Sequence, residues 1–289
     1  MSRFYYVLGC VIIMLSLGLW ACNPADKPSA DLTDEEKQMP EAKYYSTDFV
    51  PYPPEITAAI ANGPVAPEKA LVFENASQLA NPGYLETENG YAMLDDGSAV
   101  VAVKTDLPGV TAEMIRWWFV WHPLKDIRYK IWYPGAHYAI GVKDVERLTN
   151  EKLSYNLRFL NNPQYPVEDT GTGVMNLSIR FVSPESFGFD TATFRKAGIE
   201  AVVCGIVGFR IGDMTLDHTY MCHVFRKKGD GLELRSRFWL GKKLNMPKIR
   251  KLVITEEMAT GMLLHCSREF THLGGFLPQI YQEFGRQDQ

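Results

Sequence analysis

Beyond residue 90, hydrophobic and polar residues alternate in several short runs, and this pattern predicts β-strands. The first run, Gly90 to Lys104, contains the β-rich stretch 99–103. Further strands are expected at Arg128–Trp132, Val174–Val182, Ala201–Phe209, Thr219–Phe225 and Leu232–Leu240. The segment Lys228-Gly229-Asp230-Gly231 predicts a tight hairpin between the last two strands.

Capping and terminating residues in the sequence predict two helices. Thr111 is placed to cap a short aromatic helix that Pro123 ends, and Thr255 is placed to cap a long helix that reaches Leu273, before Gly274-Gly275. Many antiparallel strands followed by one long C-terminal helix predict an α+β domain, with the sheet curled around the helix and a cavity between them.

The N-terminus has the pattern of a secretory signal peptide. Arg3 is the only charged residue before Asp26, and the apolar run 4–21 ends just before Cys22. This ending resembles the bacterial lipobox, in which the cysteine receives lipid and becomes residue one. We therefore expect residues 1–21 to be removed and Cys22 to anchor the chain to a membrane surface. An ordinary cleaved signal or a single uncleaved span is the alternative.

Asn23 follows the expected lipidation site, and this residue favours sorting to the outer membrane, with the protein facing the periplasm. Residues 22–70 are rich in proline and charged residues, so we interpret 23–45 as a flexible tether and 46–70 as an extended or partly helical arm. Residues 71–289 form the expected globular domain.

Composition narrows the function classes. The net charge is −4, and removal of residues 1–21 deletes one arginine and no acid, which leaves −5; this balance argues against nucleic acid as a partner. Three of the five cysteines lie beyond residue 22, with no metal-type or scaffold spacing, so a Cys204–Cys222 disulfide is open but not expected. Cys266 is interpreted as a core residue rather than a nucleophile. A homodimer is also left open.

The candidate chemistry lies in the long helix. His265 and Glu269 are spaced i, i+4, and His272 follows at i+7, so all three are predicted on one helix face. Imidazoles and a carboxylate among apolar positions cost stability unless they meet a partner, and a divalent metal is the simplest one. The alternative is a helix with partly exposed histidines and a surface glutamate.

Further ligands must come from elsewhere in the chain. His137 follows a Pro-Gly turn, where ligand residues often sit, whereas His122 suits a helix C-terminus, where an imidazole meets free carbonyls. Glu168, as a bare sequence feature, is more typical of a solvated loop acid.

Four segments together resemble one known family. They are Trp117-Trp118 through Trp121-His122-Pro123, Tyr129-Lys130-x-Trp132 through His137, Arg235-x-Arg237-Phe238-Trp239-Leu240-Gly241, and His265-Cys266-x-x-Glu269-Phe270-x-His272-Leu273. Over roughly residues 70–285 the chain resembles the 2,4-diacetylphloroglucinol hydrolases, which include phloretin hydrolase. The resemblance implies a Bet v 1-like helix-grip fold. It also implies zinc-dependent hydrolysis of a carbon–carbon bond between an acyl group and a phenolic ring.

The same resemblance implies a set of site residues. The family's metal ligands correspond to His137, Glu168, His265 and Glu269, and one zinc ion per chain is expected. Glu168, which looked like a loop acid on its own, is therefore an expected ligand. Tyr129 and His223 correspond to polar, candidate catalytic groups beside the substrate.

Two positions depart from the family pattern. Phe238 stands where the family has a pocket tyrosine, and Ile140 stands where it has an asparagine. Both changes remove a hydrogen-bonding group from the expected substrate pocket. The predicted substrate is therefore a small aromatic acyl compound with fewer ring hydroxyls or a larger apolar acyl part.

Each catalytic assignment has a plain alternative. His223 is either a general acid or base or a strand histidine that faces solvent, and Tyr129 is either a proton donor or part of the cavity wall. The rival function is an envelope lipoprotein that binds or carries hydrophobic or aromatic ligands without catalysis, and stoichiometric metal separates the two.

Overall fold

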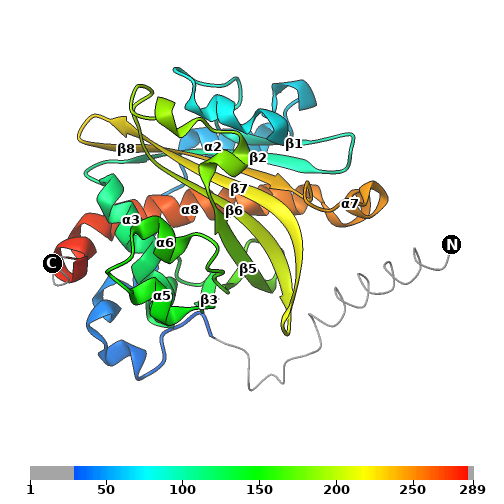
Figure 1. The fold of residues 1–289 in the computed structure, drawn as a ribbon. Coiled ribbons are helices and arrows are strands. Elements are labelled where there is room, and N and C mark those ends of the chain that lie inside the picture. The colour runs from blue at the N-terminus through cyan, green and yellow to red at the C-terminus, as the bar shows by residue number, and fades with distance from the viewer. Residues whose placement is uncertain (1–28, 286–289) are drawn as a thin grey trace.

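The computed structural model describes residues 29–285. Its centre is an eight-stranded antiparallel sheet with the order β1-β2-β8-β7-β6-β5-β4-β3 (Figure 1). The strands are β1 Gly90–Met93, β2 Ala99–Leu107, β3 His137–Ala139, β4 Val167–Asp169, β5 Val174–Val182, β6 Ile199–Ile211, β7 Met214–Lys228 and β8 Gly231–Leu240.

One long helix, α8 (Glu256–Ile280), packs along this sheet against β1 and β2. The other helices are α2 Pro54–Asn62, α3 Ala112–Trp121, α4 Asp126–Lys130, α5 Val145–Thr149, α6 Tyr155–Phe159 and α7 Pro247–Val253. Figure 1 shows α7 near the start of α8, and α3 near its C-terminal end. The predicted α+β helix-grip architecture is confirmed by this strand order and by the long C-terminal helix.

Short 3₁₀ turns connect these elements. They are Glu36–Gln38, Pro40–Tyr44, Pro67–Lys69, Phe73–Ala80, His122–Leu124, Pro184–Phe187 and Thr191–Thr193, and a π-helical turn, Tyr281–Gly285, follows α8.

Helix α8 begins as predicted and ends later than predicted. The Thr255 hydroxyl accepts a hydrogen bond from the Met258 amide, which caps the first turn. The glycine pair does not stop the helix, because Leu277 and Ile280 beyond it are fully buried. A β-carbon at Gly274 would lie 2.8 Å from Leu107 Cδ2, so this glycine allows close helix–sheet packing instead.

The predicted strand at Arg128–Trp132 is wrong, because this segment lies in α4 and the turn after it. Burial here is nearly continuous rather than alternating, and it includes Ile127, Tyr129 and Ile131. Even Lys130 is buried, where its ammonium lies 2.8 Å from the Glu36 carboxylate. Tertiary contacts therefore decide the conformation of a segment whose local pattern is ambiguous.

Residues 29–45 differ from the flexible tether that we expected. They contain two 3₁₀ turns, and the carboxylates of Glu36 and Glu41 are buried against α4. Glu41 lies 3.0 Å from the Arg128 guanidinium. This part of the chain is packed onto the helix that carries Tyr129, while the expected signal peptide and Cys22 lie outside the described residues.

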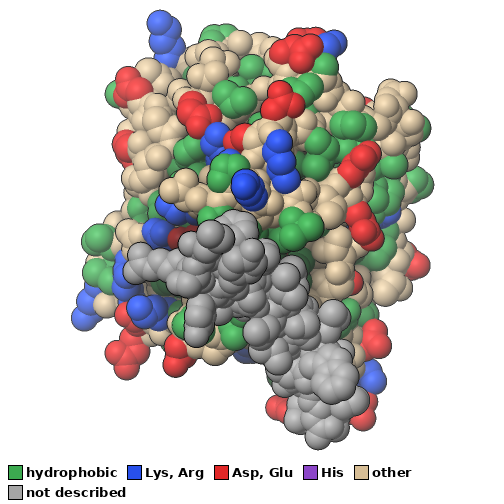
Figure 2. Space-filling model, turned by 90° about the vertical axis from the view of Figure 1, so that its right-hand side faces the viewer, with side chains coloured by type: hydrophobic (Ala, Val, Ile, Leu, Met, Phe, Trp, Pro, Cys, Tyr) green, Lys and Arg blue, Asp and Glu red, His purple; other side chains and the backbone are tan. Residues whose placement is uncertain are grey.

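The surface is mixed in charge. On the face seen in Figure 2, acidic and basic side chains are interspersed over most of the visible area. None of the helices within residues 29–285 is long and apolar enough to cross a bilayer.

The face of β8 turned away from α8 is held by a buried ion network. Arg235 and Arg237 are fully buried, and both donate hydrogen bonds to the Glu88 carboxylate. Burial alone would raise the pKa of Glu88, but the hydrogen bond from Arg235 and the charges of both arginines lower it to about 2.

Replacing Glu88 with glutamine is expected to destabilise the fold by about 3 kcal/mol at neutral pH, because two buried guanidinium groups lose their counter-charge. The pKa of Glu88 falls on folding from 4.5 to about 2, so its contribution is present above pH 4.5 and is lost as the pH falls toward 2. Urea unfolding of wild type and Glu88→Gln should give curves that converge over this range. Glu86→Gln, in an exposed pair with Lys69, is the control and should change stability by less than about 1 kcal/mol.

Candidate metal centre

Two buried histidines face each other between the sheet and α8. The Nε2 atoms of His137 and His265 are 3.3 Å apart. Each Nδ1 lies 3.1 Å from a backbone carbonyl, that of Tyr129 for His137 and that of Asp169 for His265. A carbonyl oxygen only accepts, so each Nδ1 carries the proton and each Nε2 turns a lone pair toward the other. Two opposed lone pairs at this distance repel each other, and a cation between them would remove the repulsion.

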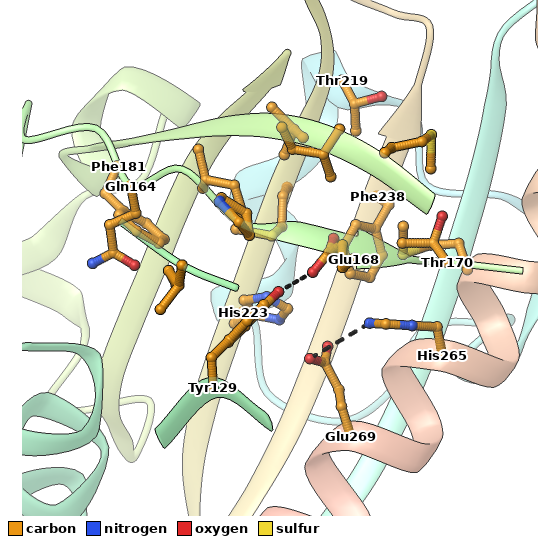
Figure 3. A pocket seen from close by; sticks show the side chains of 18 of the residues that line it. Tyr129, Gln164, Glu168, Thr170, Phe181, Thr219, His223, Phe238, His265 and Glu269 are labelled. Atoms are coloured by element: carbon orange, nitrogen blue, oxygen red, sulfur yellow. Dashed lines mark hydrogen bonds and ion pairs between the residues drawn. The ribbon is translucent and has the colours of Figure 1, made fainter. Parts of the chain in front are cut away.

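Two carboxylates complete the cluster. Glu168 Oε2 lies 3.7 Å from His137 Nε2. Glu269 Oε2 lies 3.8 Å from His137 Nε2 and 3.9 Å from His265 Nε2. Figure 3 shows Glu168, His265 and Glu269 converging on one point. The structure thus brings together all four residues expected as ligands, and the ligand atoms of three of them, His137, Glu168 and His265, lie within 4.8 Å of one another.

The electrostatics of the cluster also point to a cation. Burial raises the pKa of Glu168 to about 7, and burial together with the Glu168 charge raises the pKa of Glu269 well above its ordinary value. Burial lowers the pKa of His265 to about 4, and burial together with the neighbouring His265 lowers the pKa of His137 well below its ordinary value. A divalent ion would stabilise the carboxylates as anions and the imidazoles as neutral ligands. Two nitrogen and two oxygen donors fit such an ion.

The four groups are positioned as two rigid pairs. His137 and Glu168 are direct cross-strand partners in the β3–β4 ladder, so the short hairpin sets them side by side. His265 and Glu269 share one face of α8 as an i, i+4 pair.

Glycines bring the two pairs together. The loop after β4 crosses α8 so closely that a β-carbon at Gly261 would lie 2.5 Å from the Thr170 carbonyl oxygen. Asp169 shapes this loop, because its carboxylate accepts hydrogen bonds from the amides of Gly171 and Gly173 at 2.8 and 2.9 Å. Sequence reasoning missed Asp169 and Gly261, although the Asp-x-Gly-x-Gly pattern was a readable turn signal.

The cluster lies in the wall of a largely apolar cavity between the sheet and α8. Tyr129, His223, Ile140 and Phe238 all line this cavity. The Tyr129 hydroxyl donates a hydrogen bond to Glu168. The alternative of a solvent-facing His223 is wrong, because this side chain is only 3% exposed. Its Nδ1 lies 2.8 Å from the Ser236 hydroxyl, and burial lowers its pKa to about 3.

Comparison with known proteins identifies the family. The model of the DAPG hydrolase PhiG domain matches residues 71–282. The chain belongs to this family. A 2,4-diacetylphloroglucinol hydrolase of Pseudomonas protegens is 33% identical over 270 residues, which cover 86% of each chain. The phloretin hydrolase of Eubacterium ramulus is 33% identical over 258 residues, which cover 86% of this chain and 92% of the relative.

Solved structures are more distant than these family members. Protein Ms6760 of Mycobacterium smegmatis has a TM-score of 0.38 at 10% identity, over 65% of this chain and 94% of that one. Ara h 8.0201 has a TM-score of 0.35 at 9% identity, over 62% of this chain and 99% of that one.

The remaining histidines and cysteines lie outside the cluster of this family member. His272 packs its ring 5.0 Å from Phe49, because the i+7 position lies about 10 Å further along the helix axis than His265. His122 meets the Trp118 carbonyl at 2.7 Å, as expected at a helix C-terminus. Cys266 is fully buried, and Cys204 and Cys222 are unbridged thiols with sulfurs 3.6 Å apart.

Proposed function

We propose that the chain is a zinc-dependent hydrolase that cleaves the carbon–carbon bond between an acyl group and a phenolic ring. The observation that carries this proposal is the pair of opposed imidazole nitrogens, flanked by two carboxylates, in the wall of an apolar cavity. Family membership supports the reaction class, because the compounds that name both curated relatives carry an acyl group on a polyhydroxylated ring.

His137, Glu168, His265 and Glu269 are the residues that would hold the ion. Two imidazoles and two carboxylates suit zinc in a four-coordinate arrangement. When bound, zinc acts as a Lewis acid and orients oxygen atoms, with less acidity than an all-histidine site because two carboxylates reduce its net charge.

The reaction consumes one water molecule. The water oxygen bonds to the acyl carbon, the bond from that carbon to the ring breaks, and its electron pair passes to the ring carbon, which then takes a proton. The products are a carboxylic acid and the deacylated phenol. A hydroxylated ring supports this step because it holds the negative charge as a phenolate.

Two residues beside the cluster are proposed to handle the proton. His223 lines the cavity with its Nδ1 2.8 Å from the Ser236 hydroxyl, so its ring is proposed to take a proton from water and to return it to the ring carbon. The Tyr129 hydroxyl, which burial keeps protonated, is proposed to donate a hydrogen bond to the developing oxyanion. The aromatic and aliphatic cavity wall around them excludes bulk water.

The metal prediction is quantitative. Purified mature protein should hold about one zinc ion per chain, and His265→Ala should abolish binding because one of the two opposed nitrogens is removed. Glu269→Gln should weaken binding strongly, and Gly261→Ala should weaken it by displacing the loop that follows β4, the strand of Glu168. Elemental analysis after reconstitution and dialysis measures all four proteins.

His272→Ala is the matched control, since it removes a histidine from the same helix but not from the cluster, and it should retain full zinc. Wild-type protein without metal after reconstitution would reject the enzyme and favour the ligand-carrying lipoprotein.

The substrate is proposed to be a small aromatic acyl compound with few ring hydroxyls or a large apolar acyl part, because Ile140 and Phe238 line the cavity with apolar groups. Phe238→Tyr should shift kcat/KM toward the more hydroxylated ring by about 2- to 13-fold, the value of one hydrogen bond. A panel of acylphloroglucinols and less hydroxylated acylphenols measures the shift. Greatest wild-type activity on the most hydroxylated ring, unchanged in Phe238→Tyr, would show that this position does not set specificity.

We also propose that Cys22 carries a lipid that holds the domain at the cell envelope, in the outer membrane facing the periplasm. The lipobox-like ending Leu19-Trp20-Ala21-Cys22 supports this placement. Ser29, the first described residue, is seven positions from Cys22, so the fold would lie within about 25 Å of the membrane surface.

Cys22→Ser should move full-length protein out of the membrane fraction or leave its signal unprocessed, and both are read by fractionation and intact mass. Ala21→Gly, which keeps a small residue before the cysteine, is the control and should remain anchored. Wild-type protein found in the soluble cytoplasmic fraction would contradict the lipid anchor.

A further inference from the structure

A β-bulge on β7 brings a further histidine, His218, to the cavity. In the β6–β7 register, Val207 pairs with Thr219 and Gly208 pairs with Asp217, so His218 is the extra residue between them. In a regular strand, neighbouring side chains point to opposite faces. Here both His218 and Thr219 line the cavity, as a bulge permits.

One ring nitrogen of His218 makes a hydrogen bond, and the other has no hydrogen-bond partner within the described part of the chain. His218 is 7% exposed, and its ring stacks on Phe209 with centroids 4.1 Å apart. Its Nδ1 lies 2.7 Å from the Thr219 hydroxyl, whereas Nε2 has no hydrogen-bond partner among residues 29–285. Burial lowers its pKa to about 4, so the ring is neutral. A buried polar atom without a partner is costly, and a ligand in the cavity that hydrogen-bonds to it would offset this cost.

The bulge lies far from the metal cluster. Thr219 and His223 are four residues apart on β7, which corresponds to about 13 Å. Figure 3 shows Thr219 at the end of the pocket away from Glu269. Between these ends, Met221 and its cross-strand partner Phe238 line the cavity with apolar groups. The cavity is therefore polar at both ends and apolar in the middle.

We propose that His218, oriented by Thr219, is a second recognition point that binds a hydroxyl group at the far end of an elongated substrate. A hydroxyl both donates and accepts, so it satisfies Nε2 in either tautomer of the ring. An anion is disfavoured, because neither lysine nor arginine is among the described residues that line the cavity.

This proposal rests on the hydrolase function proposed above and adds the shape of its acyl group. With the reacting carbonyl at the metal cluster, a substrate that also reaches His218 must extend past Met221 and Phe238 in the apolar middle of the cavity. An elongated acyl part with a terminal hydroxyl group has this form. The proposal thus assigns to His218 the recognition of that terminal hydroxyl.

The test compares phloretin, which has a hydroxyl on its second ring, with the analogue that lacks only that hydroxyl. Zinc-loaded mature protein is titrated with each compound by quenching of tryptophan fluorescence, since Trp132 lines the cavity, and kcat/KM is measured in parallel. Wild type should bind phloretin about 3- to 10-fold more tightly. His218→Phe retains the ring stack on Phe209 and should reduce this ratio to about 1, with little change for the analogue.

Ile179→Val is the matched control, because it trims an apolar group of the same cavity and should change both affinities alike without changing their ratio. If His218→Phe does not fold, Thr219→Val, which removes the hydroxyl that orients His218, should lower the ratio instead. Equal affinities in wild type, binding of neither compound, or an unchanged ratio in both variants would overturn the second recognition point.

The readouts separate this proposal from the hydrolase function. A hydroxyl preference in binding without turnover supports the recognition point and rejects the hydrolase. Turnover of both compounds at equal affinity rejects the recognition point and leaves the hydrolase intact.

Discussion

The site depends on the fixed orientation of two imidazole rings. Because the Nδ1 atoms of His137 and His265 are committed to backbone carbonyls, neither ring can turn its lone pair away from the other. The protein therefore maintains a repulsive contact at 3.3 Å in a buried place, beside two carboxylates. A cation placed between the two nitrogens would offset this repulsion, and binding of such an ion to the folded chain alone would stabilise the fold.

This orientation is supported from two directions. From one side, the loop after β4 approaches α8 through Gly261 and presents the Asp169 carbonyl to His265. From the other side, α4 presents the Tyr129 carbonyl to His137.

Helix α4 is itself fixed by ion pairs with the N-terminal segment 29–45. Glu36 and Glu41, in the 29–45 segment, pair with Lys130 and Arg128 on either side of Tyr129. The segment nearest the expected membrane anchor is thus in contact with the helix whose Tyr129 carbonyl orients His137.

Local sequence rules predicted the parts of the site that lie within one element. The spacing of His265 and Glu269 placed both on one face of a capped helix, and the structure agrees. Strands β3 and β4 escaped prediction because each has three residues, too few for a periodic pattern, so Glu168 became a candidate ligand only through family resemblance. The helix at 126–130 was missed because its burial comes from distant partners such as Glu36.

His218 was missed for a different reason. The rule of alternating faces places it opposite Thr219, and the bulge that overrides the rule depends on pairing with β6, which no local pattern records. Long-range pairing, rather than residue preference, is what the sequence left undetermined.

The two faces of strand β8 have different roles: one packs into the fold and the other lines the cavity. Arg235, Arg237 and Trp239 alternate on the face away from α8, where Glu88 and the Leu71 carbonyl at 2.7 Å from the indole hold them. Phe238, on the opposite face, lines the cavity.

The motif Arg-x-Arg-Phe-Trp that carries the family resemblance is therefore mainly structural. Phe238 in this motif lines the cavity, and it is one of the two positions at which the resemblance implies a different, polar residue. Because alternation keeps the two faces independent, a tyrosine-to-phenylalanine change there alters the polarity of the cavity without disturbing the buried arginine network. The scaffold and the His–Glu cluster can thus stay constant while the polarity of the cavity changes.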